Sequence, residues 1–93
     1  MFKPVLDPRL ERAHRHSSCN RDELLTSPLC GCFHCCELFP PAEIAEWIND
    51  ALVDGRNGRT AVCPRCGIDS VIGSASGFPI TAEFLAAMTK RYF

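Results

Sequence analysis

Two short stretches, CFHC at residues 32–35 and CPRC at residues 63–66, decide the fold of this 93-residue chain. In each stretch two residues separate the cysteines, so the backbone can curl until both sulfurs face one ion. Two such pairs in one small chain are typical of a single tetrahedral site with four thiolates. Pro64 inside the second pair and Gly67 just after it suit the tight turn that such a knuckle needs. We predict a structural Zn²⁺ whose ligands are Cys32, Cys35, Cys63 and Cys66.

The first pair lies in a crowded stretch, which leaves its ligands less sharply defined. Cys30 and Cys36 flank the pair, and either could replace one of its ligands. Cys30 is otherwise expected to be a buried, small apolar residue beside the site. His34 lies between the paired cysteines, where we expect a turn residue whose ring points outward. Cys19 is expected to pack at the entry of a helix.

Two other chemistries compete with zinc. Tetrahedral four-sulfur sites also hold iron, and residues 63–67 look like one knuckle of a rubredoxin, although the first pair lacks the matching glycine. CPRC also has the form of a thioredoxin-like active site, which needs a long helix directly after it. The β-branched run from Ile68 to Ile72 follows instead. Because four thiolates leave no position for water or substrate, we do not expect an enzyme.

Composition favours one small globular domain in a reducing compartment. Apolar residues make up 46 % of the chain and charged residues 23 %, which is ordinary for globular proteins. The seven cysteines are odd in number, and the start of the chain has no signal-peptide pattern. No apolar run approaches the roughly 18 residues of a membrane span. We expect a cytoplasmic protein without membrane contact, whose cysteines are metal ligands and free thiols.

Residue patterns outline an extended N-terminal arm over residues 1–18 and a zinc-ribbon-like domain over residues 19–93. The arm is broken by prolines, is then rich in Arg, His and Ser, and shows no sustained period. A short helix should begin at Asn20, with Glu23 completing a capping box, and should stop before Pro28.

Two more helices and two strands complete the predicted domain. A helix should begin near Pro41, and its apolar stripe would be Ile44, Trp47, Ile48, Ala51 and Leu52. Strands are predicted at residues 60–62 and 68–72, on either side of the second cysteine pair. The last helix should begin at Thr81, and its buried face would be Phe84, Leu85, Met88 and Tyr92. The fold class is α+β: a small zinc-ribbon-like domain with two CxxC knuckles, short antiparallel strands and about three helices.

Arginines in the arm offer a second kind of recognition. The net charge of −1 creates no global basic field. If the arm is helical, Arg9, Arg12 and Arg15 share one face and can bind the phosphates of a nucleic acid. Phe33 and Phe78 are the aromatic residues available for stacking on bases, although both could equally belong to the core or face a protein partner. A solvated segment explains the same cluster more simply.

Residues 20–93 resemble an uncharacterised family of bacterial cytoplasmic proteins with a zinc-ribbon-like core. The likeness rests on CGCFHC at residues 30–35, on Phe39, Ile44 and Trp47-Ile48, on TAVCPRCGIDSVIG at residues 60–73, and on Phe84-Leu85 with Met88. Cys36 departs from the pattern, in which a larger residue often follows the knuckle. The family has no assigned activity, so the resemblance implies a fold and a metal but no role.

We expect a non-catalytic zinc-binding module that recognises a protein partner, with the metal as a staple. A helix face or the loop at residues 73–77 would be the contact surface. The alternative is a nucleic-acid-binding zinc ribbon that uses the arginine arm, and a rubredoxin-like or thiol redox protein ranks third. The sequence determines neither the partner, nor the pathway, nor the oligomeric state.

Overall fold

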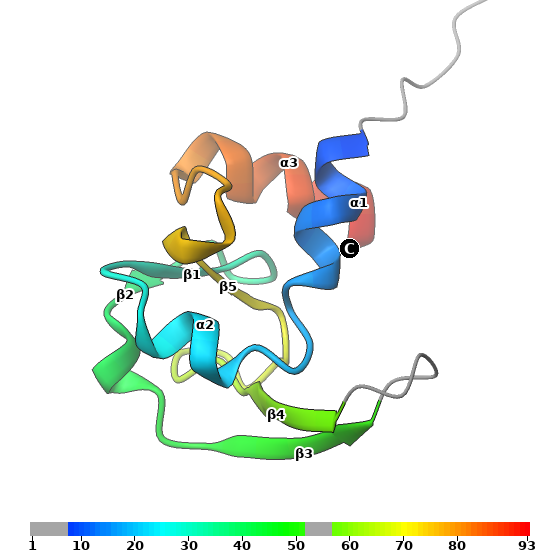
Figure 1. Ribbon diagram of the computed structural model, residues 1–93. Helices are drawn as coiled ribbons and strands as arrows, with labels where there is room; N and C mark the ends of the chain where they lie inside the picture. The colour runs from blue at the N-terminus through cyan, green and yellow to red at the C-terminus, as the bar shows by residue number, and fades with distance from the viewer. Residues whose placement is uncertain (1–7, 52–56) are drawn as a thin grey trace, which may run out of the picture.

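A small antiparallel sheet forms the centre of the molecule. The computed structural model describes residues 8–51 and 57–93 (Figure 1). The central strand β1 (Cys30–Cys32) pairs with β2 (Leu38–Phe39) on one side and with β5 (Val71–Gly73) on the other. Pairing with β5 brings the first cysteine pair next to the segment that follows the second pair.

A two-stranded hairpin takes the place of the predicted second helix. After the 3₁₀ turn η1 (Pro41–Glu43), the chain enters β3 (Trp47–Ala51), which pairs antiparallel with β4 (Asn57–Ala61). The prediction of a helix beginning near Pro41 is therefore wrong. Trp47 is half-buried against the core whereas Ile48 is exposed, which is the alternation of a strand. The apolar spacing suits both structures, and pairing with β4, which periodicity cannot detect, decides between them.

The remaining strand predictions are confirmed in part. The strand expected at residues 60–62 is the end of β4, which begins earlier than predicted. Of the strand expected at residues 68–72, only the last two residues belong to a strand, β5, because residues 67–70 complete the second cysteine turn. Leu52, the last member of the predicted helical stripe, lies outside the described residues.

The N-terminal segment contains a helix, α1 (Pro8–Arg15), where the sequence predicted an extended arm. Ala13 is fully buried, and the hydroxyl of Tyr92 donates to the carbonyl oxygen of Leu10 at 3.4 Å. Figure 1 shows α1 beside α3, away from the β3–β4 hairpin. The arm prediction is therefore wrong over residues 8–15. Two apolar side chains are too few to reveal this helix by periodicity, and packing against α3 stabilises it.

The second helix, α2 (Arg21–Leu25), begins where the sequence predicted it, but the capping box is absent. Asn20 does not cap α2, and the carboxylate of Glu23 accepts from His16 Nδ1 at 2.8 Å. Leu24 is fully buried, whereas Leu25 is 52 % exposed.

The last helix, α3 (Ala82–Tyr92), follows the prediction closely. The side chain of Thr81 accepts from the amide of Phe84, as an N-cap does. The predicted face is buried at Phe84, Leu85 and Met88. Before α3, residues 74–76 form a 3₁₀ turn, η2 (Ser74–Ser76). Within the described residues, none of the helices has the length and apolar character needed to cross a bilayer.

Two apolar clusters lie on opposite faces of the central sheet. The first packs around the cysteine turns, α2 and η1, and contains Leu24, Cys30, Cys32, Phe39, Ile44, Ala61, Cys63 and Val71. The second lies under α1 and α3 and contains Ala13, Phe33, Ile72, Ile80, Phe84, Leu85 and Met88. At Gly31, an added Cβ would lie only 2.8 Å from Leu85 Cδ1. The absence of a side chain at Gly31 therefore lets α3 approach the sheet closely.

Candidate metal centre

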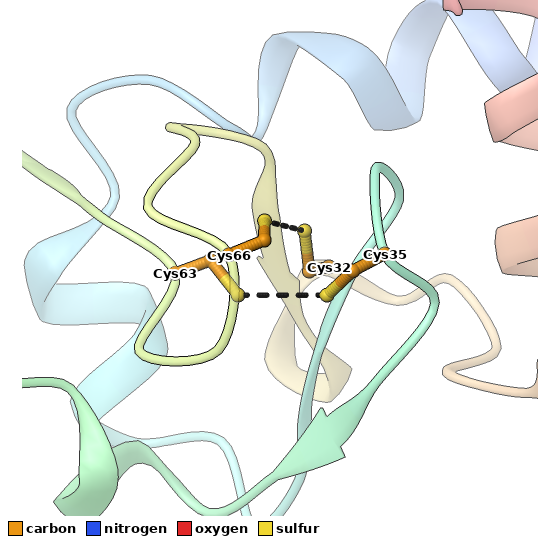
Figure 2. A group of neighbouring side chains, drawn as sticks. All are labelled: Cys32, Cys35, Cys63 and Cys66. Carbon is orange, nitrogen blue, oxygen red and sulfur yellow. Dashed lines mark hydrogen bonds between the residues drawn. The ribbon is translucent and has the colours of Figure 1, made fainter.

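The four cysteines of the two CxxC stretches meet at one point. Cys32 ends β1 and Cys35 lies in the turn before β2, whereas Cys63 and Cys66 lie in the turn between β4 and β5. Their four Sγ atoms all lie within 4.8 Å of one another. Figure 2 shows the two turns facing each other with their sulfurs in the space between them.

The separations between the sulfurs test whether one ion fits. Cys32 Sγ lies 3.6 Å from Cys66 Sγ, and Cys35 Sγ lies 3.8 Å from Cys63 Sγ, the two pairs joined by dashed lines in Figure 2. With zinc–sulfur bonds of about 2.3 Å, the edge of a sulfur tetrahedron is about 3.8 Å. The four residues can therefore hold one tetrahedral metal ion. Each of the two close sulfur pairs joins one cysteine of the first turn to one cysteine of the second.

The two turns have the same hydrogen-bond pattern, position for position. In the first, the amide of Cys32 donates to Glu37 O (3.1 Å) and the amide of Cys36 donates to Cys32 O (2.8 Å). The amide of His34 also donates to Cys32 Sγ at 3.3 Å. Such repeated amide-to-sulfur bonds orient the sulfurs and stabilise them as thiolates.

The second turn repeats each of these bonds. The amide of Cys63 donates to Ile68 O (2.9 Å), and the amide of Gly67 donates to Cys63 O (3.0 Å). The amide of Arg65 donates to Cys63 Sγ at 3.3 Å. Two unrelated stretches of sequence thus adopt one knuckle geometry and place their sulfurs in equivalent positions.

The residue after each pair adopts the left-handed backbone conformation. Its φ is 79° at Gly67 and 63° at Cys36. Glycine adopts this region without penalty, whereas a residue with a Cβ is strained there by roughly 1–2 kcal/mol. Cys36 therefore stands where the knuckle geometry favours glycine, and the surrounding contacts hold it in place.

A hydroxyl from α3 supports the first knuckle. Thr89 Oγ1 donates to the carbonyl oxygen of Phe33 at 2.7 Å and lies 3.1 Å from Cys36 Sγ. Phe33 itself is buried. Nothing in the sequence pattern marks Thr89, because it lies far along the chain in a helix whose apolar face was the visible signal. The side chain of Thr89 therefore joins α3 to the backbone of the first knuckle and does not belong to the sulfur cluster.

Burial and hydrogen bonds change the thiol pKa of Cys32, Cys35 and Cys66. Burial alone would raise the pKa of Cys32, but hydrogen bonds from the buried Ser70 hydroxyl (3.1 Å) and from nearby amides outweigh it and lower that pKa. Burial, reinforced by Cys32 and Cys63, raises the pKa of Cys66 to about 12. Burial also raises the pKa of Cys35 to about 11. One negative charge is thus favoured and further ones are opposed, and a bound divalent cation would remove that opposition.

The other candidate ligands lie away from the cluster. Cys30 is fully buried in the core, where burial raises its pKa to about 11. Cys36 points to Thr89, and the exposed ring of His34 lies 4.5 Å from the ring of Phe93. Among the described residues, the four paired cysteines form the one group that meets the geometry of a metal site.

Some of the residues proposed for nucleic acid recognition are exposed and others are buried. Arg9, Arg12 and Arg15 lie on α1 and are exposed. Phe33, by contrast, is only 2 % exposed because it packs under α1 and α3. It therefore belongs to the core and is not available for stacking on bases. Phe78 is half-buried and stacks on Phe84.

The thioredoxin-like alternative is contradicted by the path of the chain after the second pair. A thioredoxin-like motif continues directly into a helix, whereas residues 67–70 close a turn and β5 follows. All four cysteines also converge at one point, and a thioredoxin-like site would use only the second pair.

No protein-family model, curated protein or solved structure matches the chain.

Proposed function

We propose that this protein is a non-catalytic binding module of the zinc-ribbon type, in which one Zn²⁺ joins the two knuckles through Cys32, Cys35, Cys63 and Cys66. The convergence of four sulfurs at tetrahedral spacing carries the proposal. Sulfur ligands in a tetrahedral set suit zinc or iron. Because all four positions are filled by protein, the metal would act as a structural cross-link and would not activate water.

The metal requirement follows from the size of the chain. Each knuckle is a turn of a few residues, and the strands between them are short. Small folds of this kind depend on cross-links, and metal binding contributes folding free energy directly. We place the protein in the cytoplasm, where a reducing environment keeps the thiols free to bind metal.

Metal analysis of the purified protein tests the site. The wild-type protein should carry one zinc per chain, and Cys63→Ser should carry none because one of four ligands is lost. Cys36→Ser is the matched control: it makes the same change in a knuckle residue outside the cluster and should retain the zinc. Iron in place of zinc would contradict the metal assignment, and equal metal content in Cys63→Ser and wild type would contradict the ligand assignment.

For recognition, we infer a protein partner that binds beside α3. The exposed face of this helix forms an apolar hollow of about 660 Å³ between Ala86, Ala87 and Phe93. Phe93 is 61 % exposed, and Lys90 lies at the rim of the hollow. An apolar side chain next to a carboxylate on the partner would fit this combination of surface and charge.

Site-specific photo-crosslinking in cells tests the contact surface. A photoreactive residue in place of Ala87 should give an adduct with one identified protein, and Phe93→Ala should abolish that adduct. The same photoreactive residue at Leu25, an exposed apolar position on α2, is the control. The same adducts at both positions, or none at Ala87, would contradict the proposed surface.

Nucleic acid binding is the second candidate, because α1 presents Arg9, Arg12 and Arg15 to solvent. It ranks below protein recognition because Phe33, one of the two aromatic residues considered for base stacking, is buried.

A further inference from the structure

A depression of about 400 Å³ lies where α1 ends and the chain turns into α2. Arg12 and Arg15 from α1 line it, together with Glu23 from α2 and with the connecting residues His16, Ser18, Cys19 and Asn20. The two arginines are three residues apart on one helix, so their side chains lie on the same face. A volume of this size suits a small ligand.

The charges around this depression are unevenly matched. In the described part of the chain, neither Arg12 nor Arg15 has a carboxylate within ion-pair distance. The nearby acids already have cationic or donor partners: Glu23, at the wall of the depression, accepts from His16 at 2.8 and 3.0 Å, and Glu11 lies 3.9 Å from Arg91. Two guanidinium groups are therefore left to face an anion.

The carbonyl groups at the end of α1 do not oppose an anion there. A helix C-terminus normally repels negative charge, because its last carbonyl oxygens are unpaired. Here His14 O accepts from the hydroxyl of Ser17 at 2.7 Å, and His16 O accepts from Asn20 Nδ2 at 2.9 Å. The half-buried Ser18 has no hydrogen-bond partner for its hydroxyl among the described residues, so a donor remains.

We propose that this depression is a binding site for the phosphate group of a small phosphomonoester, held by Arg12, Arg15 and Ser18. Guanidinium groups match phosphate oxygens in geometry and charge, and the depression has room for the rest of a small phosphorylated molecule. The adjoining depression is less suitable, because its Arg21 already stacks over Trp47. The site is independent of the metal and lies apart from the apolar hollow on α3.

Titration of the metal-loaded protein, followed by backbone amide NMR at fixed ionic strength, tests the site. Ribose 5-phosphate should give saturable shifts in residues 12–20, and ribose alone should give none. The double variant Arg12→Gln/Arg15→Gln should bind ribose 5-phosphate at least about tenfold more weakly. Each substitution removes charge-assisted hydrogen bonds to the phosphate, which are stronger than neutral ones. Lys90→Gln, which removes an exposed positive charge from α3, should bind within about twofold of wild type.

Three outcomes would overturn the proposal. Ribose 5-phosphate could shift the amides no more than chloride does at equal ionic strength. The double variant could bind as tightly as Lys90→Gln. An oligonucleotide of eight thymidines could bind more tightly than ribose 5-phosphate, and the fall of its affinity with added salt could indicate more than two phosphate contacts. That result would assign the arginines to a nucleic acid surface.

Discussion

At the scale of single residues, Asn20 joins three segments that are distant in sequence. Its Nδ2 donates to His16 O at 2.9 Å and to Val71 O at 2.8 Å, and its Oδ1 accepts from the amide of Ala61 at 3.2 Å. The residue is buried. Asparagine before a helix is ordinarily a capping residue, but here its amide connects the entry of α2 to β4 and β5.

The substitution Asn20→Asp distinguishes a role as a helix cap from a role as a cross-link between segments. Aspartate caps helices as well as asparagine does, so a capping role predicts little change. Aspartate cannot donate, so the cross-link predicts a loss of about 2–4 kcal/mol in the free energy of unfolding, because two carbonyls lose their donor. Urea denaturation measures the difference, with the exposed Asn49→Asp as control. Equal stability of the two variants would show that the Asn20 amide is not a structural cross-link.

At the scale of elements, the first knuckle is held between β1 and α3. Thr89 Oγ1 bonds the Phe33 carbonyl, and the ring of Phe33 packs in the cluster beneath α3. The second knuckle contacts the first through sulfur and through Arg65, whose guanidinium lies 3.8 Å from the Glu37 carboxylate. That ion pair is exposed and contributes little, so the sulfur cluster is the stronger of these two contacts.

Thr89→Val tests the junction between α3 and the knuckle. Valine has nearly the same shape but no donor, so the buried carbonyl of Phe33 loses its partner, and we expect the free energy of unfolding to fall by about 1–3 kcal/mol. Thr26→Val, which removes an exposed hydroxyl at the end of α2, should change stability by less than about 0.5 kcal/mol. Chemical denaturation compares the two variants, and a loss at Thr26 as large as that at Thr89 would contradict the role of Thr89.

At the scale of the whole molecule, one cluster of sulfur joins two turns that are about 30 residues apart in the sequence. The strands of the central sheet have two or three residues each, and isolated strands of that length are unstable. Structural zinc contributes about 10–16 kcal/mol of apparent binding free energy in small zinc peptides. That amount is comparable with the total stability of an ordinary domain, about 5–15 kcal/mol.

Loss of the site should therefore unfold the entire chain. Besides losing its zinc, Cys63→Ser should lack a cooperative thermal transition, because the contribution of the metal is as large as the whole stability. Cys36→Ser should melt within a few degrees of wild type. Circular dichroism during heating measures both, and a cooperative transition of Cys63→Ser at the wild-type temperature would show that the fold does not need the metal.

Much of this molecule could be predicted from local sequence. The two knuckles depend on CxxC spacing, and α3 depends on an N-cap and a helical apolar face, all of which act over a few residues. The β3–β4 hairpin and α1 could not be predicted this way, because each is stabilised by a partner elsewhere in the chain. The cross-linking roles of Thr89 and Asn20 gave no signal for the same reason, since the hydrogen-bond partners involved are distant in sequence.

The sequence by itself determined the four cysteines that can bind a metal, since the chemistry of thiolates and the spacing within each pair are local properties. Only the tertiary structure decided that Cys30, Cys36 and His34 stand outside the cluster, that residues 47–51 form a strand, and that α1 lies on α3. Those outcomes depend on non-local pairing and packing. The free energy of such contacts depends on which surfaces meet in three dimensions, and a pattern read along the chain does not contain that information.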